Sequence, residues 1–151
     1  MTQEATETEK PGAFRSYVGH AERTADPQCR VQLPDDWIHD TPQRFIAKLG
    51  VIHPGVVSLF PPEAAQFMVP ALTSETFDPT HLLKMTKVGK DIHHVTVDSN
   101  NRLPLSEAKF RSLLTPEGKS APVKLFGSVH FFSICPLGVW PEVEQHLLNS
   151  T

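Results

Sequence analysis

The sequence has few of the features that assign a protein to a function class at sight. Only two cysteines, Cys29 and Cys135, occur in 151 residues, and they form no Cys-x-x-Cys pair, so neither a disulfide framework nor a structural zinc site is expected. No apolar run approaches the roughly 20 residues of a membrane span. A signal-peptide core is also missing from the N-terminus. We therefore expect a cytoplasmic protein with no membrane partner.

Excess positive charge and catalytic motifs are missing as well. The 14 Lys and Arg residues against 17 Asp and Glu leave a net charge of −3, so attraction to nucleic acid would need a local basic patch or an oligomer. No paired carboxylates, nucleophile–base combination or phosphate loop emerges. The adjacent His93 and His94 would point to opposite faces of a strand and are poor metal co-ligands. We expect no enzyme, no cofactor and no metal.

One pattern, however, is present twice. Asp26 begins the segment Asp-Pro-Gln-Cys-Arg-Val-Gln-Leu-Pro, and Asp98 begins the segment Asp-Ser-Asn-Asn-Arg-Leu-Pro-Leu. In both, Arg follows Asp by four positions, and two apolar residues then stand two positions apart, which is typical of a strand leaving a turn. Asp and Asn favour such turns because their side chains bond the nearby backbone and tolerate positive φ.

The spacing of these landmarks predicts a duplication. The two Asp residues are 72 positions apart, and so are the two Arg residues. Further on, Ser-Leu-Phe-Pro at 58–61 matches Ser-Ile-Cys-Pro at 133–136 with an offset of 75. We assign the three extra residues to a longer loop before the hairpin of the second copy. Residues 1–12 are then a disordered tail, 13–77 a first repeat, 78–90 a connecting helix and 91–151 a second repeat.

Local patterns predict a mainly β fold with short helices, of the α+β class. In the second repeat we expect strands at 93–97 and 102–105, a helix capped by Ser106, a hairpin over 123–135, and a terminal helix. In the first repeat the apolar residues of 35–49 suit a helix broken near Pro42, followed by a hairpin turning at Pro54-Gly55 and a short helix over 62–68.

This repeated unit of strand, Asp-x-x-x-Arg turn, strand, short helix, hairpin and helix resembles the MraZ family. That family is a tandem member of the AbrB/MazE group of swapped-hairpin DNA-binding proteins, and the resemblance covers about residues 14–148. It implies a duplicated swapped-hairpin β-barrel that forms an intramolecular pseudo-dimer. It also implies a repressor of division and cell-wall genes that binds operator DNA at the nucleoid and forms a homo-oligomeric ring. Gln28-Cys29 stands where the family usually has Lys-Gly.

Two interpretations of the Asp-x-x-x-Arg residues remain open. Each Asp–Arg pair closes its turn as a structural ion pair, or the Arg reaches a phosphate or a base edge. From the distribution of cations around the two turns, we expect DNA contact from Arg15, Arg23, Gln28 and Arg30, and a structural turn role for Asp26, Asp98 and Arg102. The alternative function is a protein-interaction or scaffold module that kept the fold and lost DNA binding.

Overall fold

The computed structural model describes residues 16–39, 42–67 and 91–149, together with positions 79, 80, 83, 86 and 87. The predicted tail at 1–12 and Arg15 lie outside these residues, as does most of the connecting helix predicted at 78–90, whose five described positions are helical. We call 16–67 the first half and 91–149 the second half. Among the described residues, no helix is long and apolar enough to cross a membrane.

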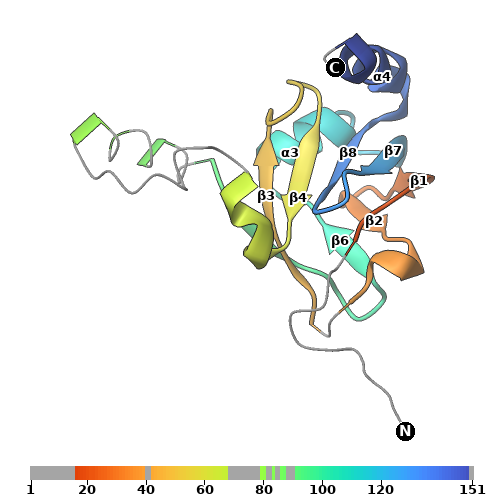
Figure 1. Ribbon diagram of the computed structural model, residues 1–151. Helices are drawn as coiled ribbons and strands as arrows, with labels where there is room; N and C mark the ends of the chain where they lie inside the picture. Colours follow the sequence, from red (N-terminus) through yellow and green to blue (C-terminus); the bar gives the residue numbers. More distant parts are fainter. Residues whose placement is uncertain are drawn as a thin grey trace, which may run out of the picture.

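The fold is mostly β, as the sequence predicts, with short helices that place it in the α+β class (Figure 1). The strands are β1 (His20–Ala25), β2 (Arg30–Gln32), β3 (Arg44–Leu49), β4 (Val57–Phe60), β5 (His93–Thr96), β6 (Arg102–Pro104), β7 (Ala121–Gly127) and β8 (Phe132–Pro136). The helices are α3 (Ala108–Leu114) and α4 (Trp140–Asn149), with 3-10 turns η1 (Asp35–Trp37), η2 (Pro62–Phe67) and η4 (Leu137–Val139).

Both sheets contain strands from the two halves, and every pairing between named strands is antiparallel. The large sheet has six strands in the order β1-β7-β8-β4-β3-β5. Its two edge strands lie on hairpins of the opposite half, because β1 pairs with β7 and β5 pairs with β3 (Figure 1). β2 and β6 pair only with each other and form a separate two-stranded element, which we call the β2–β6 ribbon.

The main core lies between one face of the large sheet and the β2–β6 ribbon with α3. Side chains alternate along each strand, so Phe45 and Ala47 of β3 enter this core while Arg44 points to the opposite face. Fully burying one Leu or Phe side chain is worth about 1.5–3 kcal/mol. The largest buried side chains of this core are Tyr17, Leu33, Phe45, Leu59, Leu103, Leu105, Phe110, Leu114, Leu125, Phe132 and Ile134.

The opposite face of the sheet is covered by α4 and η2. Val143 of α4 packs with Phe126 and Cys135 from β7 and β8, and Phe60 stacks on Phe131 with ring centroids 4.4 Å apart. Between these two clusters, Ser58 of β4 and Ser133 of β8 lie directly opposite each other and are fully buried. Their hydroxyl oxygens are 2.9 Å apart, so each hydroxyl is the other's hydrogen-bond partner.

Several element predictions are confirmed and others are wrong. Strands β5 and β6, helix α4 and the turn at Pro62 lie where the sequence places them. The helix predicted over 35–49 is wrong, because only Asp35–Trp37 is helical and Arg44–Leu49 is strand β3, paired on both edges. The hairpin formed by β3 and β4 therefore begins earlier in the chain than predicted. Ser106 does not cap α3, whose N-cap residue is Glu107.

The buried Ser58–Ser133 pair predicts a non-additive pair of substitutions. Either Ser→Ala change alone leaves one buried hydroxyl without its partner, which costs about 1–3 kcal/mol, whereas removing both hydroxyls is nearly neutral. We expect Ser58→Ala and Ser133→Ala to lower the free energy of unfolding in urea titrations, and the double variant to recover most of the loss. Additive losses in the double variant would refute the mutual hydrogen bond.

Candidate nucleic-acid interface

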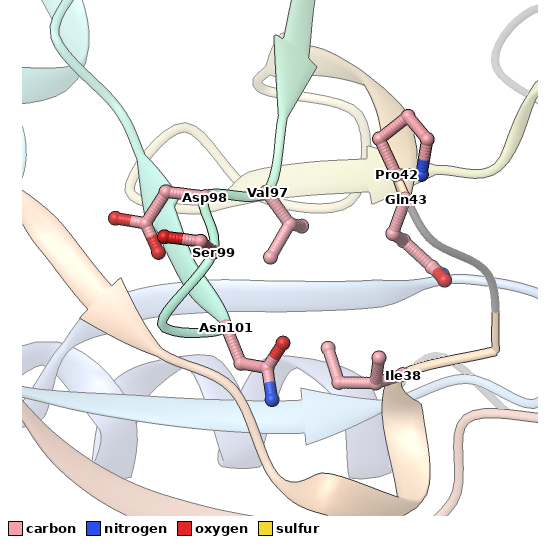
Figure 2. Close-up of a pocket in the computed structure, with 7 residues that line it drawn as sticks. All are labelled: Ile38, Pro42, Gln43, Val97, Asp98, Ser99 and Asn101. Atoms are coloured by element: carbon pink, nitrogen blue, oxygen red, sulfur yellow. The ribbon is translucent and has the colours of Figure 1, made fainter.

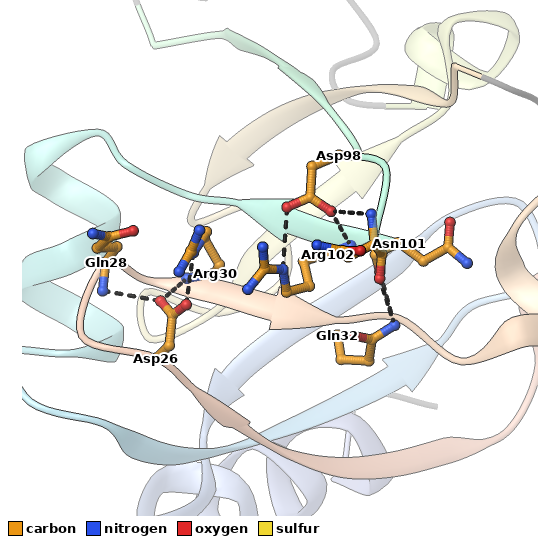
Figure 3. Close-up of polar contacts among 8 residues, drawn as sticks. Asp26, Gln28, Arg30, Gln32, Asp98, Asn101 and Arg102 are labelled. Carbon is orange, nitrogen blue, oxygen red and sulfur yellow. Dashed lines mark hydrogen bonds and ion pairs between the residues drawn. The ribbon is translucent and has the colours of Figure 1, made fainter.

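The β2–β6 ribbon presents one apolar and one polar face. Val31 and Leu103 are opposite each other and fully buried against the core. The alternate positions face away from the core and carry Arg30, Gln32 and Arg102. Arg30 is opposite Pro104 and Arg102 is opposite Gln32, so the two arginines are diagonal neighbours on the polar face (Figure 3).

The first turn is closed by the Asp26 carboxylate. Its Oδ1 accepts hydrogen bonds from the backbone N–H of Gln28 at 2.9 Å and of Arg30 at 2.8 Å. Its Oδ2 accepts from Arg30 Nε at 2.6 Å, which makes an ion pair between half-buried groups. The backbone of Cys29 donates to the Asp26 carbonyl at 2.8 Å. One side chain therefore fixes both the turn and the direction of Arg30.

The second turn repeats this geometry around Asp98. Its Oδ1 accepts from the N–H groups of Asn100 and Arg102, both at 2.9 Å, and its Oδ2 accepts from Arg102 Nε at 3.2 Å (Figure 3). The Arg30 and Arg102 side chains are similarly exposed, at 34% and 30%. The sequence predicts DNA contact for Arg30 and a structural role for Arg102. In the structure, however, each arginine makes the equivalent ion pair with the aspartate of its own turn.

Both turns require a residue in the left-handed conformation. This residue is Cys29 in the first turn, with φ of 62°, and Asn101 in the second, with φ of 61°. Asn tolerates this region better than most residues, and glycine adopts it freely. Cys29 occupies it with a fully buried side chain that contributes to the core, which a glycine would not do.

Each turn is also bound to the strand of the other half. Leu105 N–H donates to the Cys29 carbonyl at 2.9 Å, and Leu33 N–H donates to the Asn101 carbonyl at 3.0 Å. In addition, the Gln32 side-chain amide donates to the carbonyls of Asn100 at 3.1 Å and Asn101 at 3.3 Å. The two turns therefore hold each other in position across the ribbon.

The electrostatics of the two turns keep their carboxylates ionised. Burial acts to raise the pKa of Asp26, but the Arg30 N–H and guanidinium and the Gln28 N–H outweigh it and hold that pKa below its usual value. The pKa of Asp98 is lowered in the same way, against the opposing effect of burial, by Arg102 and the Asn100 N–H. Each turn therefore pairs one negative with one positive charge.

The other predicted contact residues are placed differently. Gln28 is exposed at the tip of the first turn. Arg23 of β1 lies opposite the core residue Val123, so it is on the ribbon side of the large sheet, half-buried, and donates to the Glu22 carbonyl at 3.1 Å. Arg15 is outside the described residues. Sequence reasoning did not single out Arg111, which is exposed on α3 beside the first turn.

A shallow hollow of about 360 Å³ lies beside the second turn (Figure 2). The residues that line it are Ile38, Pro42, Gln43, Val97, Asp98, Ser99 and Asn101. The Gln43 amide is already used, donating to the Tyr17 hydroxyl at 3.2 Å and accepting from the His39 N–H at 2.8 Å. Within the described ranges, no three His, Cys, Asp or Glu side chains are grouped as metal ligands.

The lowered pKa values of Asp26 and Asp98 predict a stability that depends on pH. A carboxyl whose pKa is lowered by folding stabilises the folded state above its unfolded pKa of about 4, and loses that contribution as pH falls through the folded pKa. We expect Asp26→Asn/Asp98→Asn to reduce the melting temperature at pH 7 and to flatten its decline between about pH 4 and 2. Asp36→Asn, at an exposed site, is the control. Parallel melting-temperature curves for wild type and the double variant would contradict this assignment.

No protein-family model matches the chain, and no curated protein matches it. The candidate site is therefore defined by its geometry: two arginines on the exposed face of a ribbon, each fixed by its own aspartate.

Proposed function

We propose that the two halves are copies of one swapped-hairpin unit and form an intramolecular pseudo-dimer of the AbrB kind. The strand order supports this proposal. If β1 is exchanged with β5, β3 with β7 and β4 with β8, the order β1-β7-β8-β4-β3-β5 becomes its own reverse. A sheet with a two-fold axis through its centre has this property, and the axis would pass between β8 and β4.

The strand registers support the same proposal. Val31 is opposite Leu103, which lies 72 positions later, and Ser58 is opposite Ser133, which lies 75 positions later, so each residue faces its own counterpart. Residues on a two-fold axis meet their copies in this way. Away from the axis, the pairings come in corresponding sets. Arg23 of β1 pairs with Val123 of β7. Val95 of β5, which lies 72 positions after Arg23, pairs with Phe45 of β3.

The registers also refine the insertion predicted from the sequence. Phe45 and Val123 are 78 positions apart, so six extra residues, rather than three, precede the second hairpin. The offset then falls to 75 at Ser58 and Ser133, because the loop between β7 and β8 is three residues shorter than the loop between β3 and β4. Length changes confined to loops leave the strand pairing intact.

We infer that the chain is a sequence-specific, double-stranded-DNA-binding transcriptional regulator whose recognition element is the β2–β6 ribbon. The observation that carries this proposal is the pair of arginines on its exposed face. The major groove of B-DNA admits a two-stranded β-ribbon, and Arg is the commonest side chain that reads guanine there. A repressor role follows only from the resemblance to the MraZ family.

The orientation of the two guanidinium groups suits this role. Asp26 and Asp98 each contact their arginine through Nε. Within the described part of the chain, the terminal Nη groups of Arg30 and Arg102 have no hydrogen bond, so both remain available to a ligand. A guanidinium fixed at one edge loses less side-chain entropy on binding than a free one. Because the geometry is shared, we extend the proposed contact from Arg30 to Arg102.

A second candidate function is the scaffold module without DNA binding. It is favoured by the aspartates that neutralise both arginines and by the net charge of −3. The salt dependence of DNA binding separates the two candidate functions. Phosphate contacts release counterions, so the affinity of a DNA-binding protein for DNA falls steeply as the salt concentration rises. A scaffold module without DNA binding would show no such dependence. If several weak sites act together in a homo-oligomeric ring, the acidic balance of one subunit does not prevent DNA binding.

Substitution of the ribbon arginines tests the DNA-binding proposal. We expect Arg30→Ala and Arg102→Ala to weaken binding to the DNA upstream of the protein's own gene, measured by fluorescence anisotropy. A phosphate contact flattens the slope of log affinity against log salt by about one, and a guanine contact costs about 1–3 kcal/mol at one base position. Arg44→Ala, on the opposite face of the sheet, is the control. Unchanged affinity and slope in both ribbon variants would favour the scaffold module.

Expression of one half tests the pseudo-dimer. A fragment of residues 88–151 would leave β5 without β3, β7 without β1 and β6 without β2. We expect this fragment, as a monomer, to show no sharp thermal transition, because half a core buries too little apolar surface. Recovery of a cooperative transition on dimerisation would agree with the proposal, whereas a cooperative transition in a fragment proven monomeric by sedimentation would exclude it.

A further inference from the structure

We infer that Arg111 of α3 is a further DNA contact, which binds a backbone phosphate beside the first turn and has no equivalent among the described residues that line the hollow beside the second turn. This inference rests on the proposed DNA-binding function and adds to it a residue outside both Asp-x-x-x-Arg segments. It also makes the two ends of the β2–β6 ribbon unequal in phosphate binding, although their turns are alike.

The fold places α3 against the first turn. Leu105, three residues before α3, donates its N–H to the Cys29 carbonyl at 2.9 Å. At the other end of the helix, Thr115 is buried near the Cys29 thiol. Thr115 N–H donates to the Arg111 carbonyl at 2.9 Å, so Arg111 lies one helical turn from Thr115.

The positive charge of Arg111 is available to a ligand and acts electrostatically on Cys29 of the first turn. Its side chain is exposed and has no ion pair or hydrogen bond among the residues that the structure describes. Burial raises the pKa of the Cys29 thiol overall, and Arg111 is one of the groups that act against this rise, as expected of a cation close to the first turn. Arg30 and Arg102, by contrast, each have a carboxylate partner.

The surroundings of Arg111 suit an oxyanion better than a base. It lines an open hollow of about 400 Å³ with Ser106, Ser112, Thr115 and Gly118, among other residues. Hydroxyl and backbone N–H groups are the usual partners of phosphate oxygens beside an arginine. An exposed arginine that no carboxylate of the described residues orients is suited to a phosphate, whereas reading a base requires a defined direction. The phosphate of duplex DNA is therefore the expected ligand.

The second turn has different neighbours. In the first half, η1 replaces α3, and the hollow beside the second turn is lined by Ile38 and Pro42 together with polar turn residues (Figure 2). None of the residues lining that hollow is a cation. A duplex lying along the ribbon would therefore meet three arginines around the first turn and the ribbon, but no additional cation in the hollow at the other end.

The experiment compares wild type, Arg111→Ala, Arg111→Lys and the control Arg44→Ala on the specific duplex and on an unrelated duplex, by anisotropy over a salt series. If Arg111 contacts a phosphate, Arg111→Ala should weaken binding to both duplexes by a similar factor and flatten the slope of log affinity against log salt by about one. Arg111→Lys should keep the slope, and Arg44→Ala should match wild type. Circular dichroism melts check that all variants are folded.

Duplexes in which single phosphates are replaced by uncharged methylphosphonate locate the contact. Replacing one particular phosphate on the first-turn side should weaken DNA binding by the wild-type protein but leave DNA binding by Arg111→Ala unchanged. If Arg111→Ala binds with wild-type slope while Arg30→Ala is impaired, the Arg111 contact is wrong and the ribbon proposal stands. If wild type itself shows no salt-dependent DNA binding, both proposals are wrong. Competition by free inorganic phosphate at low millimolar concentration would indicate an anion site independent of DNA, and would also overturn the inference.

Discussion

The bond from each aspartate to its own turn is the interaction on which the rest of the ribbon depends. Asp26 and Asp98 each satisfy two backbone N–H groups and one guanidinium Nε. These contacts hold the third residue after each Asp in the left-handed region, where its carbonyl accepts from Leu105 or Leu33 of the other half. Local turn chemistry and long-range pairing are therefore coupled, since neither turn reaches its observed surroundings without the opposite half.

Much of this fold could be predicted from short-range patterns, and the exceptions have a common cause. The two turns, strands β5 and β6 and helix α4 are encoded by Asp and Asn at turn positions and by clear apolar periods. Residues 44–49 are different, because Phe45, Ile46 and Leu49 suit a helix as well as a strand. These residues form a strand because they pair with β5, which lies about 50 residues later in the chain and hydrogen-bonds the second edge of β3. Such tertiary selection is not visible in a local window.

The candidate site divides in the same way. The four-residue separation of Asp and Arg, seen twice, indicates an ion pair in each turn as one of two interpretations, and the structure contains both pairs. It could not indicate that the contact uses Nε and leaves the Nη groups without a hydrogen bond among the described residues, since that depends on the side-chain geometry. Nor could the sequence associate Arg111 with Cys29, because the two are brought together only when β6 pairs with β2.

The proposed duplication and the proposed asymmetry have opposite consequences for DNA recognition. A ribbon whose two arginines are related by a two-fold axis matches a DNA site whose half-sites are inverted repeats, because the symmetry of the reader and of the site then coincide. Joining both units in one chain removes the need for them to stay identical. The first half keeps η1 where the second has α3, and Arg23 stands where the second half has the core residue Val95. The proposed base reading through Arg30 and Arg102 can therefore remain symmetric while the proposed phosphate contacts, which position the protein without specifying sequence, become unequal. A tandem protein built in this way would bind a near-palindromic site in one preferred orientation, which a homodimer of identical units cannot do.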